Sequence, residues 1–120
     1  MSEAKQFTNN QVDSIIATIP SGSTTSNIVK LYGCTAIGFT TPSALTTTSI
    51  TFLGRMGKDG SFVPVFDNSN PSVLLSKTVT TSTGYPLNAE IFAPYDAIKV
   101  VAADGNEGAA RDIIIKPFLI

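Results

Sequence analysis

Two short stretches of the chain gather the oxygen-bearing side chains that bind hard cations. They are Asp104-Gly105-Asn106-Glu107-Gly108 and Asp67-Asn68-Ser69-Asn70. An EF-hand calcium loop needs a bidentate glutamate at loop position twelve, but counting from Asp104 that position is Ile115, inside an expected strand. Asp and Asn also form turns through their own side chains. We therefore interpret both stretches as connections between strands, with cation binding as the alternative.

Residues suited to acid–base or nucleophilic catalysis are scarce. The chain has no histidine, which excludes Ser-His-Asp and Cys-His arrangements and imidazole-ligated metals. Cys34 is the sole cysteine, and its apolar neighbours are typical of a half-buried thiol. The spacing of the three glutamates and six aspartates does not single out a glycosidase pair. We expect a protein that is not an enzyme and holds no metal or other cofactor.

The charge pattern argues against nucleic-acid and membrane partners. Eight basic and nine acidic residues leave a net charge of −1, and no two basic residues are adjacent. A protein that binds nucleic acid through phosphate contacts needs a basic patch. Aliphatic runs such as residues 100–103 are far too short to span a bilayer. Residues 1–10 show no apolar signal segment, so we expect synthesis and folding in a reducing cytoplasm.

Aromatic side chains offer one possible binding surface. Tyr32, Tyr85 and Tyr95 could stack on sugars, although the chain has no tryptophan. The alternative role for the aromatic residues is the core, because most phenylalanines lie within apolar alternation. The phenylalanines expected in the core are Phe39, Phe52, Phe62, Phe66 and Phe92.

The elements that must carry these residues are short strands. Residues 50–56 alternate with the period of a pleated strand, Asp59-Gly60 suits a tight turn, and residues 62–66 alternate again. This pattern predicts a hairpin in which Pro64, lacking an N–H, lies at a sheet edge or a bulge. The other expected extended segments are 12–19, 28–32, 35–40, 73–80, 85–90, 97–102 and 111–116, with Gly33-Cys34 as a turn and 91–96 as an irregular turn.

This strand pattern predicts an all-β fold. About eight short strands separated by turn residues are typical of an antiparallel β-sandwich, here jelly-roll-like. Residues 97–102 and 111–116 are expected to form a second hairpin-like pair. We predict a flexible N-terminal arm over residues 1–11 and one sandwich domain over 12–120 that ends in an apolar C-terminal tail.

Some apolar residues are not accounted for by a core. Leu53, Val101 and Ile114 alternate out of phase with the core residues and should face outward. The chain also ends on three apolar residues. Such surface is typical of an assembly interface. The alternative is that a second sheet of the same sandwich or the N-terminal arm covers these residues, which suits Leu53 and Val101 better than the end of the chain. The residues expected to make intermolecular contacts are Phe7 in the arm and Phe118, Leu119 and Ile120 in the tail.

Several segments together resemble small β-sandwich virion proteins of tailed bacteriophages, in particular head decoration (cement) proteins. The match extends over about residues 15–117 and departs from the family pattern at Ala110-Arg111-Asp112. The segments that carry it are Ile19-Pro20-Ser21-Gly22-Ser23-Thr24-Thr25-Ser26, Ile37-Gly38-Phe39-Thr40-Thr41-Pro42, Asp59-Gly60-Ser61-Phe62-Val63-Pro64-Val65-Phe66-Asp67, Asp96-Ala97-Ile98-Lys99-Val100-Val101 and Arg111-Asp112-Ile113-Ile114-Ile115-Lys116-Pro117.

The resemblance implies a non-enzymatic protein on the outer capsid surface of the virion. It would bridge subunits of the major capsid protein, stabilise the head, and self-associate as a homodimer or homotrimer. Two alternatives stay open, because the shared motifs are those of a fold. One is a carbohydrate-binding module of a virion adhesin, and the other is a head-fibre or tail structural subunit.

Overall fold

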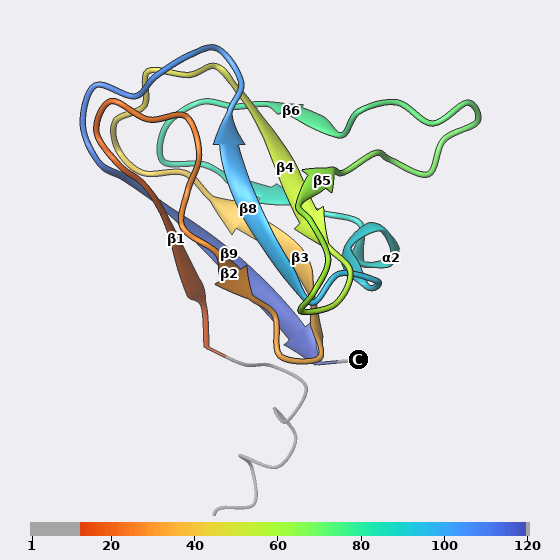
Figure 1. Ribbon diagram of the computed structural model, residues 1–120. Coiled ribbons are helices and arrows are strands. Elements are labelled where there is room, and N and C mark those ends of the chain that lie inside the picture. Colours follow the sequence, from red (N-terminus) through yellow and green to blue (C-terminus); the bar gives the residue numbers. More distant parts are fainter. Residues whose placement is uncertain (1–12, 120) are drawn as a thin grey trace, which may run out of the picture.

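Alternating apolar and polar residues build two antiparallel sheets packed face to face in this computed structural model, which describes residues 13–119 (Figure 1). Residues 1–12 and 120 lie outside the described part, and with them the expected arm, Phe7 and Ile120. The elements are β1 (Ile15–Ile19), β2 (Val29–Lys30), β3 (Cys34–Thr40), β4 (Ser49–Arg55), β5 (Val63–Pro64), β6 (Ser76–Thr78), β7 (Gly84–Pro86), α2 (Ala89–Phe92), β8 (Ala97–Ala102) and β9 (Arg111–Leu119). The expected all-β antiparallel sandwich is confirmed.

The first sheet has the strand order β1-β9-β3-β7, and the second has the order β2-β8-β4-β5, with β6 also paired to β4. All of these pairings are antiparallel. The edge strands are therefore β1 and β7 in the first sheet and β2, β5 and β6 in the second, and β1 and β2 lie next to each other on one side of the sandwich (Figure 1).

Strand β4 shows how the sequence pattern produces the sandwich. Its side chains alternate in burial along the whole strand, and Ile50 and Phe52 point inward with no exposed surface. Leu53 pairs with Pro64 in β5, which lies at the edge of its sheet. The expected hairpin and the edge position of Pro64 are both confirmed.

The core is centred on Phe52. Its ring packs edge-to-face against Phe92 at 5.2 Å and against Phe39 at 5.8 Å. Phe39 stacks on Tyr85 at 5.2 Å. Full burial of one such side chain stabilises the fold by about 1.5–3 kcal/mol. Three of the five phenylalanines expected in the core, Phe39, Phe52 and Phe92, are buried there.

The expected hairpin between residues 97–102 and 111–116 is wrong. Strand β8 pairs with β2 and β4, whereas β9 pairs with β1 and β3 in the opposite sheet. The connection from 103 to 110 therefore crosses from one sheet to the other. The alternation correctly predicts two strands. It does not assign them to a sheet, because the buried aliphatic face of each strand suits either sheet.

Other local expectations also differ from the structure. Residues 85–90 are not one strand, because Asn88 caps a short helix through a hydrogen bond from the backbone N–H of Glu90. The turn expected at Gly33-Cys34 is centred on Tyr32-Gly33 instead, and Cys34 is buried and begins β3. The last strand runs to Leu119, so Phe118 and Leu119 are strand residues rather than a tail.

Phe66 was expected in the core and is 51% exposed, while Val65 beside it is fully buried. Phe62 is only partly buried. In residues 62–66 the even-numbered and the odd-numbered side chains are all apolar. The pattern therefore does not show which of the two groups points into the core. The smaller valine faces the core, and both phenylalanine side chains lie outside it.

Candidate functional site

The acidic connection between β8 and β9 binds the protein's own backbone. The carboxylate of Glu107 is buried and accepts hydrogen bonds from the backbone N–H groups of Thr46 and Thr47, each at 2.8 Å. Arg111 Nε donates to the same carboxylate at 2.8 Å. Burial raises the pKa of Glu107, but these donors outweigh it, so the pKa lies below its ordinary value.

Asp104 has a similar role nearby. Its carboxylate accepts hydrogen bonds from the backbone N–H and the hydroxyl of Thr48, which lower its pKa. Both carboxylates therefore hold residues 46–48 against the β8–β9 connection. Among residues 13–119, no group of three or more Asp, Glu, His or Cys side chains is arranged to hold a metal ion.

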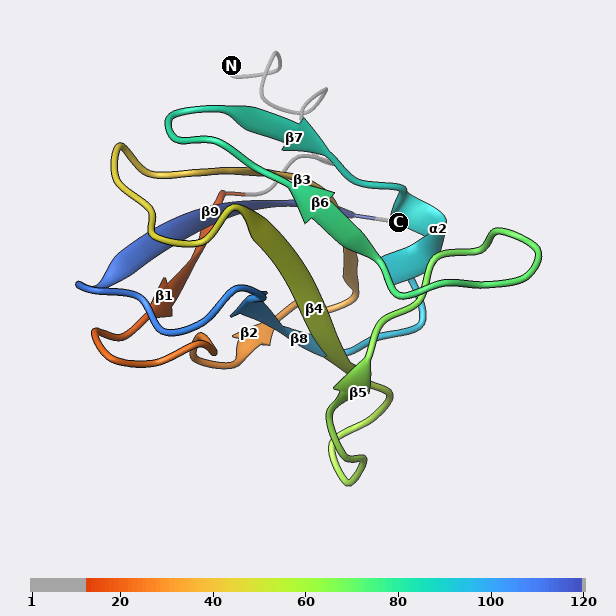
Figure 2. The same cartoon turned by 90° about the horizontal axis from the view of Figure 1, so that it is seen from above.

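Asp67 organises the second acidic stretch. Its Oδ1 accepts hydrogen bonds from the backbone N–H groups of Ser69 and Val73, each at 3.1 Å, and from the Ser69 hydroxyl at 2.6 Å. These bonds lower the pKa of Asp67, the side chain of Ser69 contributing most. The side chain thus shapes the segment from 67 to 74, here named the projecting loop, which extends away from the sandwich (Figures 1 and 2).

The base of the projecting loop exposes apolar side chains. Phe66 and Leu74 face each other across an isolated β-bridge, and both are exposed. Val73, next to Leu74 in the sequence, and Val63, in β5, are also exposed. Apolar groups clustered on a protruding loop are typical of a contact surface. In both views the loop points away from β1, which lies on the opposite side (Figures 1 and 2).

A second surface lies where the two sheets approach each other, between the edge strands β1 and β2. The strands are joined at one end, where Thr18 N–H donates to Asn27 Oδ1 at 2.7 Å and Asn27 N–H donates to Thr18 O at 3.2 Å. Toward Asp13 the strands separate. We call this opening, with the cavity described next, the seam.

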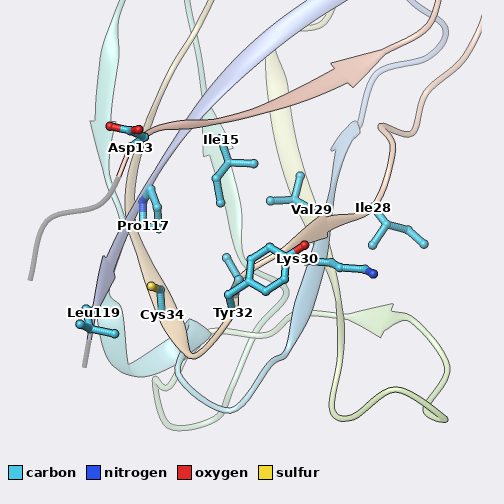
Figure 3. A pocket seen from close by; sticks show the side chains of 10 residues that line it. Asp13, Ile15, Ile28, Val29, Lys30, Tyr32, Cys34, Pro117 and Leu119 are labelled. Carbon is cyan, nitrogen blue, oxygen red and sulfur yellow. The ribbon is translucent and has the colours of Figure 1, made fainter.

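The seam contains an open cavity of about 600 Å³ (Figure 3). Its walls are mainly apolar, and Cys34 and Leu119 lie on its β3–β9 side. A proline is tolerated at position 117 because β1 ends at the Ile15–Ile115 pair. Beyond that pair β9 has only β3 as its neighbour in the sheet, so no strand on the β1 side needs the missing N–H. The full lining is Asp13, Ile15, Ile28, Val29, Lys30, Leu31, Tyr32, Cys34, Pro117 and Leu119.

Backbone groups of both edge strands point into the seam. In an antiparallel ladder, alternate residues turn their N–H and C=O groups away from the paired strand. Thr18 in β1 is such a residue, since it bonds to Asn27, so Ile16 two positions earlier is another. Leu31 bonds to Asp96 beyond the end of β8, so the groups of Lys30 point away from β8. Both edges are therefore open to a further strand.

Tyr32 stands at the mouth of the cavity in a strained conformation. Leu31 O accepts a hydrogen bond from Cys34 N–H at 2.9 Å, and the two residues between them have φ values of +52° and +80°, typical of a type I′ turn. Gly33 adopts such a φ at no steric penalty, whereas a tyrosine is disfavoured by about 1–2 kcal/mol. The side chain is 80% exposed, so core packing does not offset this strain.

A smaller cavity of about 300 Å³, lined mainly by charged residues, adjoins the seam. Tyr32 and Lys30 line both cavities, and Lys58 lies in the smaller one. Arg55 forms a two-point ion pair with Asp96 at 3.1–3.2 Å, which lowers the pKa of Asp96. Neither lysine has an ion pair within residues 13–119. The smaller cavity therefore carries excess positive charge.

Phe62 contacts Arg55, which lines the smaller cavity. Its ring lies 4.6 Å from the ammonium of Lys99 and 5.2 Å from the guanidinium of Arg55, both in cation–π range. Phe62 thus brings together a cation from β4 and a cation from β8, two neighbouring strands of the second sheet.

The three tyrosines do not form a joint sugar platform. Tyr85 stacks on Phe39, and the Tyr95 ring packs against Gly54, so each is partly buried. Only Tyr32 among them is exposed. Of the expected contact residues, Leu119 lines the seam cavity, and Phe118 is half-buried in β9.

Sequence reasoning missed Ile28, Lys30 and Lys58 as members of a site. The one signal in the sequence was the Tyr32-Gly33 pair, because a glycine suits a turn. The structure shows that Gly33 has a positive φ and that Tyr32 is exposed. The role of Ile28 and Lys30 depends on the pairing of β2 with β8, which sequence alternation does not reveal.

Comparison with known proteins identifies no relative. No protein-family model, curated protein or solved structure matches this chain. The described residues also contain no helix with the length and apolar character that crossing a bilayer requires. The function must therefore be argued from the two surfaces themselves.

Proposed function

We propose that this protein is a non-enzymatic bacteriophage capsid decoration protein that binds the outside of the head and bridges neighbouring subunits of the major capsid protein. The observation that supports this most is the presence of two separate apolar surfaces on one small sandwich. The seam lies at the β1–β2 edge, and the projecting loop points away on the opposite side (Figure 1). A bridging protein needs two such surfaces.

Bridging by a small domain depends on multivalency. Each surface exposes only a few apolar side chains, so each contact is weak alone. Once one surface binds, the second finds its partner at a high effective concentration, and overall binding is much tighter. Self-association into a homodimer or homotrimer would multiply this effect on a symmetric lattice.

Co-sedimentation tests the proposal. Purified protein is mixed with mature heads, immature shells and tails of the phage that carries the gene, and bound protein is measured in the pellets. We expect saturable binding to mature heads. Absence of binding to heads contradicts the proposal, and binding to tails alone supports a tail subunit instead.

The exposed ring of Tyr32 beside Lys30 supports a second candidate, a carbohydrate-binding module of a virion adhesin. Exposed aromatic faces with polar neighbours stack on sugars. Binding on a glycan array that is lost in Tyr32→Ala, without binding to heads, would favour this candidate. The apolar lining of the larger cavity favours a protein partner.

A further inference from the structure

We propose that the seam binds an extended peptide segment that carries a large apolar side chain close to a carboxylate. The inference rests on the proposed function, under which this segment belongs to the major capsid protein. Three features lead to this ligand class. They are the open strand edges and the apolar cavity of the seam, together with two lysines, Lys30 and Lys58, that line the adjoining cavity and have no ion pair within residues 13–119.

The open edges specify an extended backbone. The N–H and C=O groups of Ile16 and of Lys30 point into the seam from the two edge strands. A peptide in β conformation would supply donors and acceptors to these groups, as in other cases of strand addition. Ile16 is also 50% exposed and has no neighbouring lysine or proline in β1 to block edge pairing. The Thr18–Asn27 bonds close one end of the seam and so limit the register of the added segment.

The cavity specifies an apolar side chain. Ile15, Ile28 and Leu119 present hydrocarbon to a space of about 600 Å³, which is within the range of ligand pockets. The labelled side chains in Figure 3 surround this space, with the Tyr32 ring at its mouth. A large aliphatic or aromatic residue of the peptide would remove this surface and one face of Tyr32 from water. Such burial would offset the backbone strain at Tyr32.

Lys30 and Lys58 specify a carboxylate in the peptide, close to its large apolar residue. Lys30 and Lys58 have no ion pair within the described part of the chain, while Arg55 is neutralised by Asp96. Because Lys30 and Tyr32 line both cavities, an apolar side chain in the larger cavity places neighbouring peptide residues beside the lysines. Charge complementarity therefore favours Asp or Glu there and disfavours Lys or Arg.

The test selects random peptides displayed on yeast against the full-length protein. Selected peptides are then measured against Lys30→Glu/Lys58→Glu and against the control Lys77→Glu, which changes a lysine in β6 outside both cavities. We expect peptides with an acidic residue close to a large apolar one, and about tenfold weaker binding to the double variant than to the control. Bound peptide should also slow alkylation of Cys34 by iodoacetamide, since this thiol lies in the cavity wall.

Four results would overturn the inference. They are no enrichment, enriched peptides without acidic residues, equal binding to the double variant, and peptide binding that appears only after deletion of residues 1–12. The last would show that the chain's own N-terminal segment, or that of a second copy, occupies the seam. Head binding is measured in parallel. Heads that bind wild type and the double variant equally refute the seam inference alone, whereas peptide binding without head binding refutes the proposed function alone.

Discussion

Glu107 Oε2 accepts a hydrogen bond from the backbone N–H of Thr47 at 2.8 Å, across a sequence separation of 60 residues. Together with Arg111 and Thr46, this bond ties the β8–β9 connection to the loop before β4. Two chain segments that cross between the sheets are thereby joined at the end of the sandwich through one buried carboxylate.

Replacing Glu107 with Gln should destabilise the protein by about 2–4 kcal/mol, because a buried charge network is broken and one backbone donor loses its acceptor. Urea unfolding measures the change. The control Glu90→Gln alters an exposed side chain in α2 and should change stability by less than about 0.5 kcal/mol. Equal effects of the two substitutions would contradict this role of Glu107.

The same carboxylate predicts a pH dependence of stability. Its pKa in the folded protein lies below the ordinary value of 4.5, so its stabilising contribution is present above that pH and is lost as the pH falls through the folded value. Wild type should therefore lose stability in acid more steeply than Glu107→Gln. Unfolding curves at several pH values below 5 would test this, and parallel losses in the two proteins would refute it. Asp67, Asp96 and Asp104, whose pKa values are also lowered, add acid sensitivity to both proteins.

Gly54→Ala should destabilise the protein by about 1–3 kcal/mol through overpacking. A Cβ atom at Gly54 would lie 2.5 Å from Cδ1 of the Tyr95 ring, which covers this point of β4. Gly84→Ala in β7 is the matched control, because its Cβ would meet only an atom at 4.0 Å. Thermal unfolding of both variants and of Gly54→Ala/Tyr95→Ala tests the prediction. If removing the ring does not reduce the effect of Gly54→Ala, the contact is not its cause.

Tyr32→Asn should stabilise the protein by about 0.5–1 kcal/mol, because asparagine tolerates a positive φ better than tyrosine. The same substitution should weaken binding to heads, since the exposed ring is lost from the seam. Calorimetry and co-sedimentation measure the two effects. Gly33→Ala, at φ +80°, should instead destabilise the turn. Unchanged head binding in Tyr32→Asn would show that Tyr32 is not part of the contact surface.

The double substitution Phe66→Ser/Leu74→Ser should reduce head binding with little loss of thermal stability, because both side chains are exposed. Met56→Ser is the control, as it removes another exposed apolar side chain outside both surfaces. Co-sedimentation over a concentration series measures affinity. Similar affinities for the double variant and Met56→Ser would show that the projecting loop is not a contact surface.

Local sequence was informative where a clear turn separated two alternating segments. The β4–β5 hairpin, with Asp59-Gly60 between its strands and Pro64 at the edge, is such a case. It did not predict which side chains face the core where both faces of a segment were apolar, as at Phe66. It also did not predict which strands pair with each other. The placement of β9 between β1 and β3 depends on a crossover of the chain, and strand propensity carries no information on that crossover.

The candidate site was less predictable than the fold for the same reason. The sequence indicated apolar residues at the end of the chain, and one of them, Leu119, lines the seam. The seam itself is assembled from β1, β3 and β9 of the first sheet and β2 of the second, which are far apart in the sequence. Lys30, Tyr32 and Lys58 come together through this tertiary arrangement, so no local motif marks them as a group.

A cryo-EM map of mature heads saturated with the protein tests the central claim most directly. We predict that each sandwich contacts two neighbouring capsid subunits, one through the seam and the other through the projecting loop. Density that touches a single subunit, or heads that carry no added density, would contradict the claim that the protein bridges the shell.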